Sequence, residues 1–290
     1  MNTALIDNAR IAAGPGEIYR ALTDPAALRV WLAEHAEVSL PDHRFEFWGR
    51  YTPQGVPGRQ HLVEADPDRL LRFTWKLDDV ETTTTITLRP DGPSSSLLSL
   101  EQSGLPSMEE LMAPAGRRDG LHSLHTFWPL AIANLAEYVE GRELTPRCDF
   151  SDDRPLSIRA TITLDATPAE VFTSLTDTGR IARWFGWEVE LEPRLGGRVV
   201  FGADAEITDF EPGRLLVFAD KQGMVTRWEL AGSGGKTRLT FVQSGFADDE
   251  RDNLAQHEAG WFGALAELKR MHTLGDTWTP LTTPHDDDRE

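Results

Sequence analysis

Residues 168–184 read PAEVFTSLTDTGRIARW, and residues 15–31 read PGEIYRALTDPAALRVW. The two stretches align without a gap at an offset of 153 residues. Further matches follow in the same order, while the offset falls from 145 to 133: Arg69-Leu70-Leu71 with Arg214-Leu215-Leu216, Gln102-Ser103-Gly104 with Gln243-Ser244-Gly245, and Trp128 with Trp261. A repeat of this kind predicts two copies of one domain whose loops differ in length.

The repeat also predicts the domain boundaries. The two copies span about residues 1–143 and 155–275. Residues 144–154 contain a proline and three aspartates, a composition typical of an exposed linker. Residues 276–290 have no apolar periodicity, so we expect a disordered tail there.

Each copy shows the same order of predicted elements. In the second copy, an alternating strand at 157–164 is followed by a helix cap at Thr167 and by two short helices that end near Trp184. About six further β segments and one long helix come next, and apolar residues in that helix recur every three or four positions. Only a curved antiparallel sheet wrapped around the last helix can bury all of these apolar faces, which predicts an α+β fold in both copies.

This order of elements resembles the helix-grip fold of the START-like, or SRPBCC, superfamily. The motifs PAEVFTSLTD, RIARWF, LGGRVVF, EPGRLLVF and H-x-x-G-W at 257–261 are similar to those of the AHSA-like family, the homologues of the activator of heat-shock-protein ATPase. The first copy is more diverged, with Leu124, Phe127 and Trp128 in place of the last motif. The resemblance implies two tandem helix-grip domains, each with a cavity between the sheet and the long helix.

Large aromatic residues and two histidines are the candidates for lining these cavities. The alternative is that the rings only fill the core, because each large aromatic side chain buries about 150–250 Å². The candidates in the second copy are Trp184, Phe185, Phe201, Phe218, Trp228, Phe241, His257 and Trp261, and those in the first are Trp31, Trp48, Phe73, Trp75, His125 and Trp128.

The charge of the chain excludes several kinds of partner. Lys and Arg number 29 against 47 Asp and Glu, a net charge of −18. Residues 1–149 carry −8 and the remainder −10, so both copies are acidic. Such a field repels phosphate backbones and anionic lipids, and we therefore expect neither nucleic acid nor membrane as a partner. With no secretion signal or membrane-spanning segment in the sequence, we expect a cytoplasmic protein.

No complete catalytic or metal-binding set is found. His122 and His125 share a helix face, but a metal site would need a third ligand, for which only His61 is at hand. His257 and Glu258 are adjacent on a helix, about 100° apart, which disfavours a joint acid/base role. The single cysteine, Cys148, is expected to be an exposed, inert thiol in the linker. We therefore predict no metal and no cofactor.

Three functions remain open. A protein that binds or carries a small hydrophobic or amphipathic molecule is favoured, because the fold implies a cavity and catalytic groups are missing. The alternatives are an enzyme of the polyketide cyclase or aromatase kind, and a chaperone-associated module that contacts another protein. The excess of Arg (25) over Lys (4) is typical of a GC-rich, bacterial source. The sequence does not decide the ligand or the oligomeric state.

Overall fold

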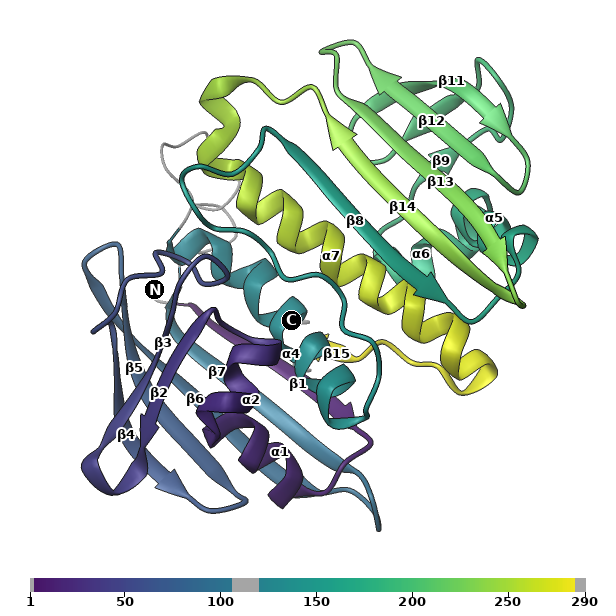
Figure 1. Cartoon of the computed structure of the whole chain (residues 1–290). Helices are drawn as coiled ribbons and strands as arrows, with labels where there is room; N and C mark the ends of the chain where they lie inside the picture. Colours follow the sequence, from purple (N-terminus) through teal and green to yellow (C-terminus); the bar gives the residue numbers. More distant parts are fainter. Residues whose placement is uncertain (1–2, 106–119, 285–290) are drawn as a thin grey trace. The chain divides into compact units, whose positions relative to one another are not determined.

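The computed structural model describes residues 3–105 and 120–284 of the chain. The chain forms two compact units (Figure 1). The first unit comprises the described residues up to Arg154, the helical segment Ala255–Gly260 and the residues from Leu281 onward. The second unit comprises Pro155–Leu254 and Trp261–Pro280.

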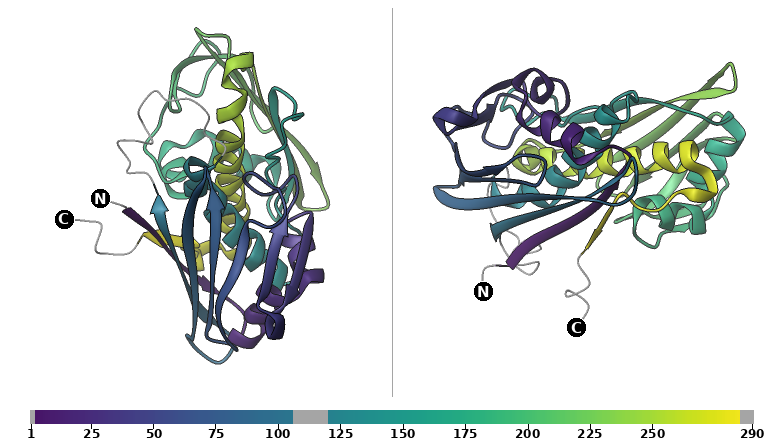
Figure 2. Two further views of the ribbon diagram at one scale, coloured as in Figure 1. Left: turned by 90° about the vertical axis from the view of Figure 1, so that its left-hand side faces the viewer. Right: turned by 90° about the horizontal axis from the view of Figure 1, so that it is seen from below.

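The first unit is built on a six-stranded antiparallel sheet, in the order β15-β1-β7-β6-β5-β4, and a separate hairpin, β2-β3. Two short helices and one long helix complete it (Figure 2). The strands are β1 (Thr3–Ile11), β2 (His35–Ser39), β3 (Arg44–Trp48), β4 (Gln60–Asp66), β5 (Leu70–Leu77), β6 (Val80–Pro90), β7 (Ser96–Leu105) and β15 (Thr282–Pro284), and the helices are α1 (Pro15–Thr23), α2 (Pro25–Trp31) and α4 (Leu124–Val139).

The second unit has the same plan, with a seven-stranded antiparallel sheet in the order β8-β14-β13-β12-β11-β10-β9. Its strands are β8 (Ser157–Leu164), β9 (Glu190–Leu191), β10 (Arg198–Val200), β11 (Asp204–Glu211), β12 (Leu215–Asp220), β13 (Val225–Ser233) and β14 (Lys236–Ser244), and its helices are α5 (Pro168–Thr176), α6 (Thr178–Phe185) and α7 (Arg251–Leu274). The predicted α+β class, with two tandem helix-grip domains, is confirmed.

Helix starts follow from local sequence in both units. The predicted cap at Thr167 is confirmed as a capping box, in which the Thr167 hydroxyl accepts from the Glu170 backbone N–H and Glu170 accepts from Thr167. Asp24 and Asp177 then cap the second short helix of each unit by accepting backbone N–H groups.

The same tertiary hydrogen bond closes the helix pair in each unit. The indole Nε1–H of Trp31 donates to the Ala21 carbonyl at 3.0 Å, and that of Trp184 donates to the Ser174 carbonyl at 2.9 Å. The two bonds span the same sequence separation, as the repeat predicts.

The linker between the copies differs from its expectation. Cys148 is only 2% exposed, and Thr145 and Arg154 are also buried. The prediction of an exposed linker with an exposed thiol is therefore wrong at these positions. The charged and polar groups of the segment find buried partners that lie far away in sequence, and these are described below.

Part of the expected disordered tail is ordered. Trp278 and Leu281 are buried, and Thr282–Pro284 form β15, which pairs with β1 in antiparallel register. The prediction is wrong for these residues, because backbone pairing with a distant strand needs no apolar periodicity of its own. Residues 285–290 lie outside the described residues.

Asp7 is a buried carboxyl group in the middle of β1. Its side chain is 7% exposed and lies on the same face of the strand as the buried Ala9 and Ile11. Burial raises the pKa of Asp7 from 3.8 to about 6, because an apolar environment disfavours the carboxylate.

Replacing Asp7 with Asn is expected to stabilise the protein at alkaline pH. A folded-state pKa that is raised means that Asp7 contributes most to stability below pH 4, and that this contribution is lost as the pH rises through 6. The shift corresponds to roughly 3 kcal/mol at most. Urea unfolding should therefore show Asp7→Asn gaining up to that amount at pH 8 and little at pH 4.

The matched control is Asp79→Asn, because the Asp79 side chain is 94% exposed. We expect it to change the free energy of unfolding by less than about 0.5 kcal/mol at either pH. An Asp7→Asn variant with no gain at pH 8 would show that the buried carboxyl group carries no cost.

Candidate functional site

The aromatic candidates of the second copy come together in one ring cluster. They come from the end of α6, from the residue after β10, from the adjacent strands β12, β13 and β14, and from α7. Trp261 of α7 contacts four other rings of the cluster, whose centroids lie 4.7–5.6 Å from the centroid of Trp261. The members of this second-unit ring cluster are Trp184, Phe185, Phe201, Phe218, Trp228, Phe241 and Trp261.

Two of these rings form the outer layer of the cluster. Phe185 and Phe201 are half-buried, whereas Trp261 beneath them is buried. The Phe185 and Phe201 centroids each lie 5.4 Å from the Trp261 centroid, with interplanar angles of 30° and 27°. Phe185 and Phe201 each lie nearly parallel to Trp261, but their own rings are tilted 55° to each other, with centroids 4.5 Å apart.

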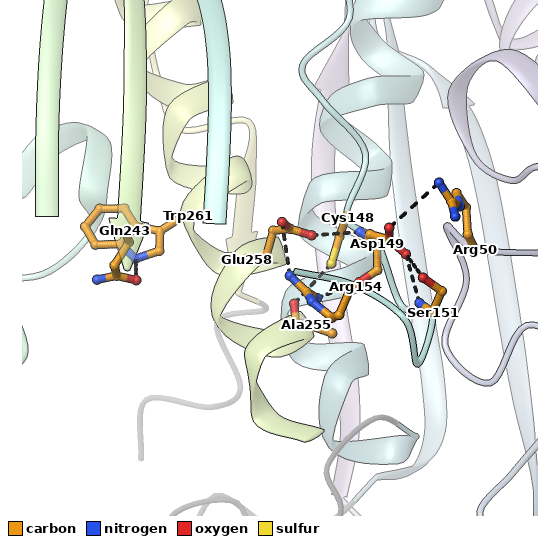
Figure 3. A network of polar contacts seen from close by, with 9 residues as sticks. All are labelled: Arg50, Cys148, Asp149, Ser151, Arg154, Gln243, Ala255, Glu258 and Trp261. Atoms are coloured by element: carbon orange, nitrogen blue, oxygen red, sulfur yellow. Dashed lines mark hydrogen bonds and ion pairs between the residues drawn. The ribbon is translucent and has the colours of Figure 1, made fainter. Parts of the chain in front are cut away.

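One polar contact lies inside the cluster. The Trp261 indole N–H donates to Gln243 Oε1 at 3.0 Å (Figure 3). The Gln243 amide in turn donates to Thr226 Oγ1 at 3.2 Å. Buried amides that are paired in this way fix the register of a helix on a sheet, because sliding would leave polar groups unpaired.

The first unit repeats this polar contact. There the Trp128 indole donates to Gln102 Oε1 at 3.2 Å, and Thr84 Oγ1 donates to the same oxygen at 2.5 Å. Trp128 and Gln102 are the residues that the repeat aligns with Trp261 and Gln243. The sequence analysis identified the tryptophans but missed the glutamines, although Gln-Ser-Gly was among the matching triplets.

The candidates of the first copy are packed more tightly. Phe73, Trp75 and Trp128 are buried, and Trp75 meets Phe47, Phe127 and Trp128 edge to face. Trp31 is also buried, while Trp48 is half-buried beside His35. The rings in mutual contact, which we call the first-unit ring cluster, are Phe45, Phe47, Phe73, Trp75, Phe127 and Trp128.

Residues 145–154 cover this first-unit cluster on one side, and we call them the strap. Phe150 packs edge to face on Phe127, with centroids 5.9 Å apart. Arg147 donates to the carbonyls of Arg29 and Ala33 at 3.0 and 2.9 Å, and its guanidinium lies 3.8 Å above the Tyr51 ring. The sequence analysis missed these residues, because their partners lie 23 positions away for Phe150 and 118 and 114 positions away for Arg147.

The family model for "Activator of Hsp90 ATPase homolog 1-like protein" matches residues 12–140 and 165–273, which is more than half of the chain. The chain belongs to this family. The two matches confirm that its domains are arranged in tandem, and we call them the first and second AHSA1-like domains.

Solved structures similar to the chain include CalU16 from Micromonospora echinospora, at 30% identity over 42% of this chain and 76% of that one, with a TM-score of 0.36. Protein MLL2253 from Mesorhizobium loti is 21% identical over 41% and 98%, with a TM-score of 0.37. DynU16, from the dynemicin biosynthetic locus, is 16% identical over 92% and 97%, with a TM-score of 0.34. A search of curated proteins finds no match.

The two histidine candidates differ in burial from the buried aromatic residues of the ring clusters. His257 is exposed, and His125 is half-buried. Within residues 3–105 and 120–284, no three His, Cys, Asp or Glu side chains gather in a way that could hold a metal ion. His122 and His61 thus have no described ligand set around them.

Glu258, beside His257, is a structural carboxylate. Its Oε1 lies 3.1 Å from Arg154 Nη2, and its Oε2 accepts the Asp149 backbone N–H at 2.8 Å (Figure 3). Burial raises the pKa of Glu258, while Arg154 acts in the opposite direction. Cys148 donates its thiol hydrogen to the Ala255 carbonyl at 3.1 Å, and burial raises the pKa of the thiol well above its ordinary value.

Within the described chain, no helix is long and apolar enough to cross a lipid bilayer.

Proposed function

We propose that the chain binds a small, flat, uncharged hydrophobic molecule at the second-unit ring cluster. The observation that carries the proposal is the half-buried pair Phe185 and Phe201, each within 30° of parallel with the buried Trp261 ring. A flat apolar molecule that packs on the exposed side of Phe185 and Phe201 would extend the offset stacking that aromatic groups prefer. Apolar walls with one or two polar groups are typical of small-molecule sites.

The charges around the second domain favour an uncharged ligand. Its half of the chain carries −10, which repels anions. The arginines that could attract an anion are engaged elsewhere: Arg183 lies 5.3 Å from the Trp278 ring, Arg198 pairs with Glu190 and Asp204, and Arg227 pairs with Glu229. With these three arginines engaged, none of them is available to an anion in the ring cluster, and burying an unpaired anion is costly.

The polar groups that border the cluster favour binding over catalysis. Gln243 and Thr226 are bonded to each other, and Gln243 is bonded to Trp261. Neither side chain takes up or releases a proton near neutral pH, so they cannot provide the acid/base steps of a cyclase. A ligand-binding or carrier role is therefore the function that this geometry supports best.

A second candidate function rests on two exposed apolar side chains. Trp187 is 72% exposed and Leu195 is 66% exposed, both in the second unit. Tryptophan is enriched among the residues that dominate protein contacts. This observation favours a chaperone-associated contact with another protein as the alternative.

We also propose a cytoplasmic location in a bacterium, with neither nucleic acid nor membrane as a partner. The net charge of −18 and the predominance of Arg over Lys support this setting.

Thermal melting of the full chain with flavone, an uncharged flat molecule, tests the proposal. One site occupied at 100 times its Kd adds about 2.7 kcal/mol, which raises Tm by several degrees. Phe201→Ala should weaken flavone binding by about tenfold, since it removes one stacking wall worth about 1 kcal/mol beyond its area. Palmitate, an anion, should give no shift.

The matched control is Trp48→Ala, which removes a large aromatic side chain outside the second-unit ring cluster. Trp48 is also half-buried but belongs to the first unit, so this variant should keep the full flavone shift. If flavone gives no shift at high micromolar concentration, ligand binding is rejected. If the chain then captures a partner protein and Trp187→Ala abolishes that capture, the protein-contact function replaces ligand binding.

A further inference from the structure

We propose that the strap, residues 145–154, is an intramolecular lid that closes a second hydrophobic ligand site in the first unit. The ligand part of this inference rests on the proposed function, whereas the movement of the strap does not. Four kinds of observation carry it: the position of the strap, the space beneath it, an unpaired buried acceptor, and the way in which the strap is held.

The strap lies beside the position that corresponds to the outer layer of the second-unit cluster. Leu32 aligns with Phe185 at the offset of 153 residues. In the second unit Phe185 is half-buried, but Leu32 is buried and lines a small cavity together with the strap residues Arg147, Cys148 and Phe150. In the first unit the strap thus covers the position that corresponds to Phe185, which is only half-buried in the second unit.

The covered space is small and apolar in the closed state. Its volume is about 10 Å³, and α2 and α4 supply most of the remaining wall through Trp31, Phe127, Leu130 and Ala131. A cavity of this size holds one water molecule at most. A larger molecule can therefore enter only if the strap moves away.

Asn134 lines this space and offers a hydrogen-bond acceptor to a polar group of a ligand. Its side chain is 1% exposed and lines the cavity, and its Oδ1 has no hydrogen-bond partner among the described residues. Buried amide oxygens are almost always paired. A ligand that is mainly apolar and has one N–H or O–H donor would satisfy Asn134.

The strap is held mainly by side-chain contacts, with one backbone hydrogen bond from the Phe150 N–H to the Arg50 carbonyl at 2.6 Å, and it lacks regular secondary structure. No helix or strand is assigned from residue 142 to residue 156. Its anchors are Arg147 on the Arg29 and Ala33 carbonyls, Phe150 on Phe127, and the Asp149 and Arg154 contacts to Glu258. A segment held in this way can open locally without breaking a sheet or a helix.

An intramolecular lid lowers the apparent affinity of the site that it covers by the fraction of time that the lid is open. The first unit would then bind ligand only after its strap opens, whereas the second unit binds directly. Weakening a strap anchor should raise the number of ligands per chain from one to two.

Cys148 reports on the opening of the strap, because it is the only cysteine of the chain and a buried residue of the strap itself. In the wild-type full chain, its reaction with DTNB should show a rate that hardly changes at low urea concentration. Global unfolding would instead give a rate that rises with the full urea dependence of unfolding. A rate that follows global unfolding at every urea concentration would overturn the proposal.

Arg147→Gln weakens the anchor at the centre of the strap. It should speed the DTNB reaction by at least tenfold and raise the stoichiometry of 6-hydroxyflavone, a flat molecule with one O–H donor, from one to two, as measured by calorimetry. The matched control is Arg142→Gln, because Arg142 lies just before the strap and pairs with Glu140. This control should leave both values unchanged.

The two readouts separate the possible failures. A faster thiol reaction with the stoichiometry still at one would overturn the second site, although the strap moves. Unchanged thiol rates in Arg147→Gln would overturn the lid itself. Zero 6-hydroxyflavone bound in every variant would reject the proposed function and the second ligand site together, and the thiol rates would still decide whether the strap opens.

Discussion

Trp261→Ala is expected to lower the free energy of unfolding of the second unit by about 3–5 kcal/mol, the usual cost of removing a large buried aromatic side chain. The ring is buried and contacts four other rings, so its loss leaves a cavity in the packed cluster. The substitution also leaves Gln243 Oε1 without its indole donor. Urea unfolding followed by circular dichroism measures the loss.

Two further variants fix the interpretation of that result. Trp128→Ala removes the equivalent ring of the first unit and should cost a similar amount, because Trp128 is buried and bonded to Gln102. Trp187→Ala should cost less than about 0.5 kcal/mol, since that side chain is 72% exposed. A loss below about 1 kcal/mol for Trp261→Ala would mean that the indole is not part of a packed core.

Glu258→Gln is expected to cost about 3–5 kcal/mol, because it removes one partner of a buried ion pair. The side chains of Arg154 and Glu258 are 3% and 9% exposed, so water cannot replace the missing carboxylate. Arg154 would keep its contact to the Asp149 carbonyl but would lose its counter-charge. Urea unfolding at pH 7 measures the effect.

Replacing both partners at once separates the ion pair from simple packing. The double variant Glu258→Met with Arg154→Leu removes both charges of this pair. It should therefore recover most of the stability lost in Glu258→Gln. If the double variant is as unstable as the single one, the cost comes from lost packing or from the Asp149 contact, and the ion pair is not the cause.

The parts of the fold that the sequence predicted are those with local signals. The repeat aligned residues 15–31 with 168–184, and the structure has two helices at each place. Trp228 of β13 and Phe241 of β14 were named among the aromatic candidates, and both are buried. Capping is equally local, because Thr167 and Glu170 lie within one helical turn.

What the sequence could not predict depends on partners that are distant along the chain. Pro146 and the three aspartates of the linker suggested exposure, yet Arg147, Cys148 and Phe150 pack against residues from other elements. Likewise, nothing in the adjacent pair His257 and Glu258 tells which is buried. That choice follows from Arg154, which lies 104 positions before Glu258 and carries the charge that a buried carboxylate needs.

The outer layer of the second-unit ring cluster is an intermediate case. The sequence named Phe185, Phe201 and Trp261 as candidates, on the basis of the family resemblance. It could not say that two of the rings stay half-buried above the third, because that depends on where the end of α6 and the residue after β10 meet α7.

The most direct test of ligand binding at Trp261 is a ¹⁵N-indole NMR titration of the full chain with flavone. The nine indole N–H signals are assigned with single Trp→Phe variants. Binding at the second-unit ring cluster predicts that the Trp261 signal shifts with increasing flavone and saturates, while the Trp75 and Trp128 signals of the strapped first unit stay in place. A titration in which Trp261 does not move, or in which Trp128 moves instead, would contradict the account.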